Sequence, residues 1–304
     1  MSLFVQQIFN GLKVGSVYAL VALGYTMVYG IIRLINFAHG DFIMVGAYTL
    51  CYTIPLMVNA GMPAWMAVVL GIVVCVIVGV VVELLAYRPV RKKGTNMTAL
   101  ITAISMSLFL QNTAQSLFGS APKPITTIFD LEPINIAGVS IAGETLVTIL
   151  IGFAVMITLT VVVNKTKIGR SMRAVSQDRQ AAILTGVNVN RTITLTFAIG
   201  AALAALAALM YCANYPAASP TMGGMLGLKA FVAAVLGGIG IIPGAMLGGI
   251  LVGLVESLSK AYSAVLTGGI ITSAFSDAVV FMILIFVLLI RPAGILGKNE
   301  REKV

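Results

Sequence analysis

Charged residues are scarce in this chain, and their scarcity indicates its class. Only 10% of the 304 residues are charged, whereas 59% are hydrophobic and the mean hydropathy is +1.05. A soluble globular protein needs a charged surface, so lipid must be the solvent for most of this chain. The sequence therefore predicts an integral membrane protein.

Other absences exclude particular kinds of site. His39 is the single histidine, which excludes a multi-histidine metal site. Cys51, Cys75 and Cys212 lie in apolar runs without a C-x-x-C spacing, so we expect neither a disulfide framework nor a bound metal. The chain has no G-x-x-x-x-G-K-[ST] motif, so it is expected to bind no ATP and no other cofactor. Any energy from ATP would therefore have to come from a partner.

The apolar residues form runs that are long enough to cross a bilayer. A hydrocarbon core about 30 Å thick needs roughly 20 residues of helix. Runs of this kind occur at about residues 14–32, 42–59, 64–86, 97–118, 143–163, 193–213, 229–260 and 275–290. The predicted fold is an all-α polytopic membrane protein with about eight or nine transmembrane helices, in one transmembrane domain over residues 1–304.

The basic residues lie between these runs, and their positions predict the topology. The net charge of +9 does not indicate a nucleic-acid-binding protein, because the basic residues form no single face. They concentrate at residues 88–93, in the segment 164–191 and after Arg291, which the positive-inside rule places in the cytoplasm. The acidic, proline-containing connection 119–144 is expected to be an ordered extracytoplasmic loop.

The run 229–260 is too long for one span and contains the sequence GGIGIIPGAMLGG at residues 237–249. The topology also requires an odd number of crossings after residue 223, where only two runs are visible. A helix, a break and a returning helix, or a re-entrant hairpin, would resolve both points. The expected break, and candidate lining of a translocation pathway, comprises Gly237, Gly238, Gly240, Pro243 and Gly244. Close helix packing through glycine is the alternative explanation.

The segment 164–191 is expected to contain a short cytoplasmic helix at about residues 177–185. Ser176 is a suitable N-cap, Asp178 would lie in the first turn, and Gly186 would end the helix.

This helix would present Ala181, Ala182 and Leu184 as an apolar patch beside Arg179 and Gln180, suited to docking on another protein. A solvated basic loop close to the membrane is the alternative.

The sequence Q-A-A-x-x-x-G at residues 180–186 is similar to the E-A-A-x-x-x-G signature of ABC importer permeases, with Gln180 in place of the usual Glu. The whole chain resembles LivH-type branched-chain amino acid permeases, notably at residues 11–47, 176–189, 227–256 and 291–298. The blocks INFAHGD at 35–41 and GLKAFVAAVLGGIG at 227–240 are specific to that group. The resemblance implies a transport subunit without catalytic residues, not an enzyme, that imports leucine, isoleucine and valine across the bacterial inner membrane while partner subunits use ATP. It also implies a second homologous permease subunit, two ATP-binding cassette ATPases that dock at residues 164–191, and a periplasmic amino-acid-binding protein, with membrane lipid around the chain.

Polar groups between the first two apolar runs are further candidates for the pathway. Asn36, His39 and Asp41 belong to the sequence INFAHGD, where Gly40 would permit a bend. Asp41 would cap the next helix, and a neutral His39 would steady the bend.

Other ionisable residues are expected to have structural roles. Lys229 would extend toward the membrane surface, Glu256 and Lys260 would pair at i and i+4, and Asp277 would cap the last helix.

Two rival functions remain open at this point. A permease for urea, an amide or a sugar would have the same fold and the same docking loop. An ion-coupled secondary transporter would need carboxylates within the membrane, whereas Glu83, Glu256 and Asp277 are expected near helix ends.

Overall fold

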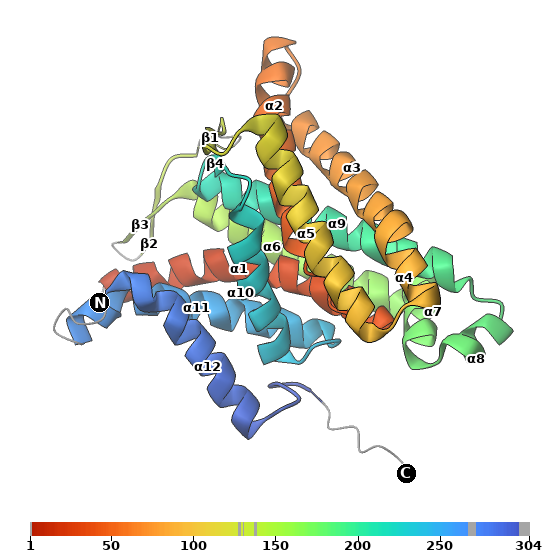
Figure 1. Cartoon of the computed structure of the whole chain (residues 1–304). Coiled ribbons are helices and arrows are strands. Elements are labelled where there is room, and N and C mark those ends of the chain that lie inside the picture. Colours follow the sequence, from red (N-terminus) through yellow and green to blue (C-terminus); the bar gives the residue numbers. More distant parts are fainter. Residues whose placement is uncertain (1, 127–128, 130, 137–138, 267–271, 298–304) are drawn as a thin grey trace. The chain divides into compact units, whose positions relative to one another are not determined.

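The computed structural model describes residues 2–126, 129, 131–136, 139–266 and 272–297, and most of them are helical (Figure 1). The longer helices are α1 (Ser2–Ile32), α2 (His39–Asn59), α3 (Trp65–Val82), α5 (Asn96–Phe118), α6 (Gly143–Lys165), α9 (Val189–Asn214), α10 (Met222–Gly237), α11 (Ile242–Leu266) and α12 (Ser276–Ile290). Within the described residues, seven helices are long and apolar enough to cross a membrane, and α10 and α12 are shorter apolar helices. The prediction of an all-α polytopic membrane protein is confirmed.

Two helices begin more than five residues earlier than the apolar runs predict. α1 starts at Ser2, because its polar N-terminal residues find partners within the protein: the Ser257 hydroxyl donates to the Gln7 carbonyl at 3.0 Å and to its side-chain oxygen at 2.8 Å. α10 starts at Met222, ahead of the predicted residue 229.

The chain divides into two compact units that are interleaved in sequence. Unit 1 comprises residues 1–26, 130–156 and 229–304, and unit 2 comprises residues 27–129 and 157–228. Three of the four boundaries between the units fall inside α1, α6 and α10, and the fourth falls in the connection 119–144. That the whole chain acts as one permease domain stays a prediction.

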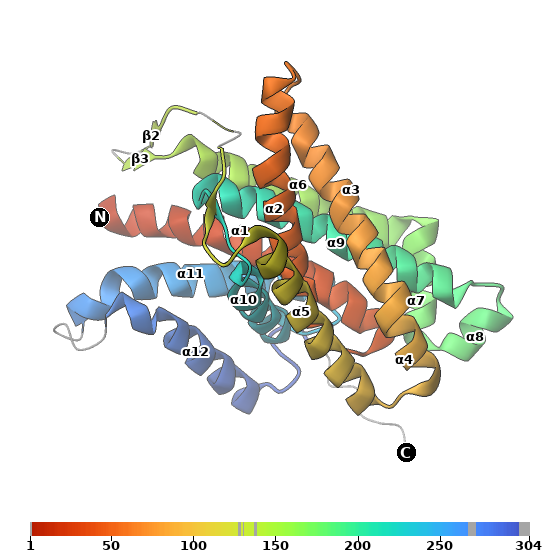
Figure 2. The same ribbon diagram turned by 45° about the horizontal axis from the view of Figure 1, so that its top comes forward.

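In unit 2, α2, α3 and α9 pack against one another, as both ribbon views show (Figures 1 and 2). Small residues allow this approach: a Cβ on Gly46 would lie 2.9 Å from the Ala208 side chain, and one on Gly79 would lie 2.6 Å from the Ala201 side chain. Helices in lipid associate through such close backbone packing, because the lipid provides no hydrophobic drive between them.

In unit 1, glycines join α1 to α11. A Cβ on Gly11 would lie 2.8 Å from the Leu254 Cα, and one on Gly253 would overlap the backbone of Gly15. Gly11 and Gly15 are four residues apart, which is the spacing that brings two glycines to one face of a membrane helix.

Short strands order the described parts of the connection 119–144. β1 (Lys123–Pro124) pairs with β4 (Ala217–Ala218), and β2 (Ile134–Ile136) pairs with β3 (Val139–Ile141), both antiparallel. The strands were not predicted, since they are two or three residues long. The extracytoplasmic position of this loop stays a prediction.

Candidate functional site

The basic segment 164–191 folds into two short helices, α7 (Lys167–Gln177) and α8 (Arg179–Leu184). Asp178 is the N-cap of α8, and its carboxylate accepts hydrogen bonds from the backbone N–H groups of Gln180 at 2.7 Å and Ala181 at 3.1 Å. The prediction that Ser176 caps this helix is wrong. Because α7 continues to Gln177, the Ser176 hydroxyl instead donates to the Arg173 carbonyl within α7 at 2.8 Å.

Gly186 terminates α8 as predicted. It has a φ of +81°, a left-handed conformation that glycine adopts without steric cost. The Gly186 N–H donates to the Ile183 carbonyl at 3.0 Å and the Val187 N–H to the Ala182 carbonyl at 2.9 Å, which is the Schellman arrangement. Both ends of α8 are therefore fixed by its own sequence.

The exposed apolar residues of α8 differ in part from those predicted. Ala182 is 3% exposed, so it faces the protein and does not belong to an outer patch. Leu184 and Ile183 are 88% and 60% exposed, and Ala181 and Gln180 are also exposed. A fully capped helix thus presents two large apolar side chains in an otherwise basic loop.

Arg179 connects this loop to the end of α1. Its guanidinium is half-buried and donates to the Ile32 carbonyl at 2.9 Å, which satisfies a carbonyl at the helix C-terminus. The next residue, Arg33, has a φ of +56° and is the only non-glycine residue of the described chain with positive φ. Arg179 therefore binds the end of α1 and does not simply lie beside the apolar residues of α8.

The segment between α1 and α2 contains the predicted INFAHGD residues. Asn36 is buried, and its side-chain oxygen accepts a 2.6 Å hydrogen bond from the Tyr87 hydroxyl. His39 is the first residue of α2 and packs its ring edge-on against Phe42, with the ring centroids 5.7 Å apart.

Asp41 does not cap α2, contrary to prediction. The N-cap residue is Ala38, which makes no side-chain cap hydrogen bond. Asp41 is buried in the first turn, where its Oδ1 accepts a hydrogen bond from the Gln111 amide on α5 at 2.9 Å. Gly40 is helical and forms no bend. It allows contact with the backbone of Gly223, in the first turn of α10.

The glycine-rich run is broken where the sequence predicts. α10 ends at Gly237 and α11 begins at Ile242, with Gly238 and Gly240 at φ values of +110° and +91° between them. Pro243 is the second residue of α11, where a missing N–H costs nothing.

Packing accounts for the buried glycines of this run. A Cβ on Gly237 would overlap the Gly244 carbonyl, so α10 and α11 touch through their backbones. The N–H groups of Ile295 and Leu296 donate to the carbonyls of Leu236 and Gly237 at 2.8 and 3.0 Å. The C-terminal segment thus satisfies the end of α10, and a role of this run in the pathway stays a prediction.

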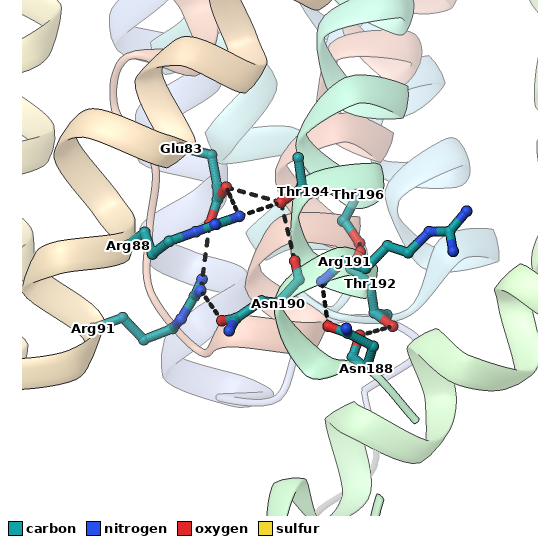
Figure 3. A network of polar contacts seen from close by, with 9 residues as sticks. All are labelled: Glu83, Arg88, Arg91, Asn188, Asn190, Arg191, Thr192, Thr194 and Thr196. Carbon is teal, nitrogen blue, oxygen red and sulfur yellow. Dashed lines mark hydrogen bonds and ion pairs between the residues drawn. The ribbon is translucent and has the colours of Figure 1, made fainter. Parts of the chain in front are cut away.

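Glu83, which the sequence places only near a helix end, is the centre of a buried polar network in unit 2 (Figure 3). Glu83 is 0% exposed and accepts hydrogen bonds from Arg88 at 3.0 and 3.3 Å, from Arg91 at 3.3 Å and from the Thr194 hydroxyl at 2.9 Å. It begins a π-helical turn, η1 (Glu83–Tyr87), that leads directly into α4 (Arg88–Lys93), so it does not lie at a free helix end. Arg91 also donates to Asn190 on α9 at 2.9 Å.

A second buried network joins helices of unit 1. Glu256 accepts hydrogen bonds from Lys229 at 2.9 Å, from Lys260 at 2.6 Å and from the Tyr18 hydroxyl at 2.7 Å. The predicted pair of Glu256 and Lys260 is confirmed. Lys229 does not extend to the surface as predicted, because it is buried and also pairs with Asp277 at 2.6 Å. Asp277 makes no cap, since the N-cap of α12 is Phe275.

The described residues contain no group of three or more His, Cys, Asp or Glu side chains that could hold a metal ion. The notable polar features are therefore the capped helix α8, the INFAHGD segment and the two carboxylate networks.

Comparison with known proteins identifies the family. Residues 7–288 match the family described as the permease component of the branched-chain amino acid transport system. The chain is 43% identical to the high-affinity branched-chain amino acid permease LivH of Escherichia coli K12 and 44% identical to BraD of Pseudomonas aeruginosa PAO1, in each case over 99% of this chain and 98% of the relative. It is 26% identical to the ribose import permease RbsC of Escherichia coli K12, over 83% of this chain and 77% of the relative. No solved structure matches the chain. The chain therefore belongs to the branched-chain amino acid transport permeases, as a multi-pass inner-membrane transport subunit and not an enzyme.

Proposed function

We propose that this chain is the transmembrane permease subunit of an ATP-driven importer of leucine, isoleucine and valine. The supporting observation is the identity of 43–44% over nearly the full length of relatives named as high-affinity branched-chain amino acid permeases. The partners are two ATP-binding cassette ATPases, a second homologous permease subunit and a periplasmic amino-acid-binding protein. ATP is bound and hydrolysed by the ATPases and not by this chain.

Helix α8 is the surface on which an ATPase docks. The observation that supports this docking is the exposure of Ile183 and Leu184 on a helix with capped ends. Two adjacent, exposed, large apolar side chains indicate a protein interface and are not explained by a solvated basic loop. Gln180, at the start of this helix, leaves the interface without the carboxylate that the family signature has there.

The rival functions have less support. The identity of 43–44% to branched-chain amino acid permeases argues against a secondary transporter. Glu83 and Glu256 each pair with two basic side chains, so of the buried carboxylates in the described residues only Asp41 has no basic partner. The sugar permease RbsC is a more distant relative, at 26% identity.

Transport is tested by the uptake of labelled leucine into proteoliposomes that contain the chain with its candidate ATPases and second permease. We expect uptake only when ATP and the binding protein are both present, and we expect unlabelled isoleucine or valine, but not ribose, to compete. Uptake driven by an ion gradient without ATP would replace the importer with a secondary transporter, and competition by ribose would favour a sugar permease.

The docking surface is tested by Leu184→Asp. The charge would be desolvated in the interface, so copurification of the ATPases should fall sharply while membrane insertion persists. Leu131→Asp is the matched control, since Leu131 is exposed in the connection 119–144, outside the docking loop. Unchanged copurification of the ATPases with the Leu184 variant would refute docking at α8.

A further inference from the structure

Three carboxylates are buried among the described residues, namely Asp41, Glu83 and Glu256, which are 1%, 0% and 2% exposed. All three belong to helices that can cross the membrane. Glu83 is balanced by two arginines and Glu256 by two lysines. In the described part of the chain, no lysine or arginine pairs with Asp41. It is therefore the one buried acidic group without a basic partner there.

The surroundings of Asp41 leave one of its oxygens available. Oδ1 accepts the hydrogen bond from Gln111, whose amide nitrogen also lies 3.2 Å from the Ser107 hydroxyl on the same face of α5. Gln111 holds the carboxylate in place and the Ser107 side chain also interacts with it, while Oδ2 is buried without a hydrogen-bond partner among the described residues.

The neighbours of Asp41 belong to the inner parts of two other helices that can cross the membrane. The carbonyl of the adjacent Phe42 lies 3.4 Å from the Cys75 sulfur, in the middle of the span Trp65–Arg91. Gln111 lies well inside the span Met97–Phe118. Asp41 therefore packs among the inner residues of two apolar spans, and an unpaired charge in such surroundings costs several kcal/mol.

Nearby helix ends compensate only in part for this charge. Asp41 lies in the first turn of α2, and the contact of Gly40 with Gly223 brings the first turn of α10 beside it. A helix N-terminus carries the equivalent of about half a positive charge, which stabilises a carboxylate without replacing a cation. The same helix starts provide the partial charge that the carboxylate of an amino acid would need.

We propose that Asp41 is the binding group of this permease for the α-ammonium of its cargo. The inference rests on the proposed function, because it requires an amino acid as substrate. The ammonium donates to Oδ2 while Gln111 holds Oδ1, and the site gains the cation that its resting state lacks. Leucine, isoleucine and valine each bring one ammonium beside a neutral side chain. A sugar or urea brings no cation, so the same group would discriminate amino acids from neutral solutes.

The decisive variant is Asp41→Asn, which keeps the shape and an oxygen for Gln111 but removes the charge. Two results are expected together. ATP-driven leucine uptake in the assembled importer should fall by about tenfold or more. A fall of this size corresponds to the loss of one hydrogen bond to a charged group. The resting permease should become more resistant to heat, because an uncompensated buried charge has been removed.

Heat resistance separates this proposal from a structural role. If Asp41 only held α2 and α5 together, Asp41→Asn would lower the melting temperature, and that result would overturn the proposal. Asp41→Glu keeps the charge and should retain more uptake than Asp41→Asn; equal loss in the two variants would assign the effect to shape and also overturn it. Glu132→Gln is the control, since Glu132 is exposed and should change neither measurement.

Leucine uptake by the wild type distinguishes a failure of the proposed function from a failure of the assignment of Asp41. Leucine uptake by the wild type together with undiminished uptake by Asp41→Asn would overturn the assignment of Asp41 and leave the proposed function standing. No ATP-driven leucine uptake by the wild type would overturn the proposed function, and the inference with it.

Discussion

Glu83 provides a stability prediction whose magnitude follows from its contacts. Glu83→Gln removes the negative charge that balances two guanidinium groups, of which Arg91 is 8% exposed and Arg88 is 29% exposed. Removing one partner of a buried ion pair costs about 3–5 kcal/mol. Here the cost should lie near the lower end, about 3 kcal/mol, because Arg88 is partly solvated and Arg91 keeps its hydrogen bond to Asn190.

The measurement is a double-mutant cycle on the purified permease in detergent, in which the melting temperature of each variant is determined. Glu83→Gln alone should lower the melting temperature by several degrees, since about 1 kcal/mol corresponds to roughly 2–4 °C in proteins of 150–250 residues. Adding Arg91→Gln removes the more buried of the two unbalanced cations, so the double variant should be less destabilised than the sum of the single variants. A coupling of about 1–3 kcal/mol is expected for residues in one such network.

Two results would refute this reasoning. One is a Glu83→Gln variant as stable as the Glu132→Gln control, which is expected to lie within about 0.5 kcal/mol of wild type. The other is additivity of the two substitutions to within about 0.5 kcal/mol, which would mean that Glu83 and Arg91 do not share a network.

Two further predictions concern the backbone. Arg33 is exposed and has a φ of +56°, so Arg33→Gly should leave the melting temperature unchanged or higher, whereas Arg33→Val should lose about 1–2 kcal/mol; equal stability of the two variants would contradict a left-handed turn at this position. Gly253→Ala should cost about 1–3 kcal/mol, because the added methyl group would overlap the Gly15 backbone. Gly71→Ala is its control, since there the methyl group would meet only the Leu50 side chain at 3.7 Å, and equal melting temperatures of the two alanine variants would argue against this packing.

The features predicted correctly depend on signals that are local in the sequence, and the lipid environment makes these signals reliable. An apolar run of about 20 residues has to become a helix in a bilayer, because only a helix satisfies its own backbone there. The break after Gly237 follows from glycines that adopt positive φ, and the end of α8 follows from Gly186. In each case the signal lies within a few residues of the feature.

The features missed depend on partners that are far apart in sequence. Glu83 bonds to Thr194, which lies 111 positions away, and Lys229 meets Glu256 27 positions away. No periodic pattern connects such residues. The π-helical turn also places Arg88 at i+5 of Glu83, a spacing that α-helical periodicity does not favour.

The cap of α8 was misassigned for a local reason. Ser176 and Asp178 are both suitable N-cap residues, and only the unpredicted helix α7, which extends to Gln177, decides in favour of Asp178. For the same reason the helix begins two residues later than expected. Ala182 faces the protein for another reason: residues two apart on an α-helix point to nearly opposite sides, so Ala182 and Leu184 cannot share one exposed patch.

The hydrogen bonds from Ile295 and Leu296 to the end of α10 have a consequence for biosynthesis. The ribosome synthesises the chain from the N-terminus to the C-terminus. Leu236 and Gly237 therefore enter the membrane well before Ile295 and Leu296 have been made. Until residues 295 and 296 emerge, the last carbonyls of α10 lack these donors, and unsatisfied backbone groups within a bilayer are costly. Completion of the glycine break therefore belongs to the last stage of synthesis, and a product that ends before residue 295 would expose this defect to the quality-control proteases of the membrane.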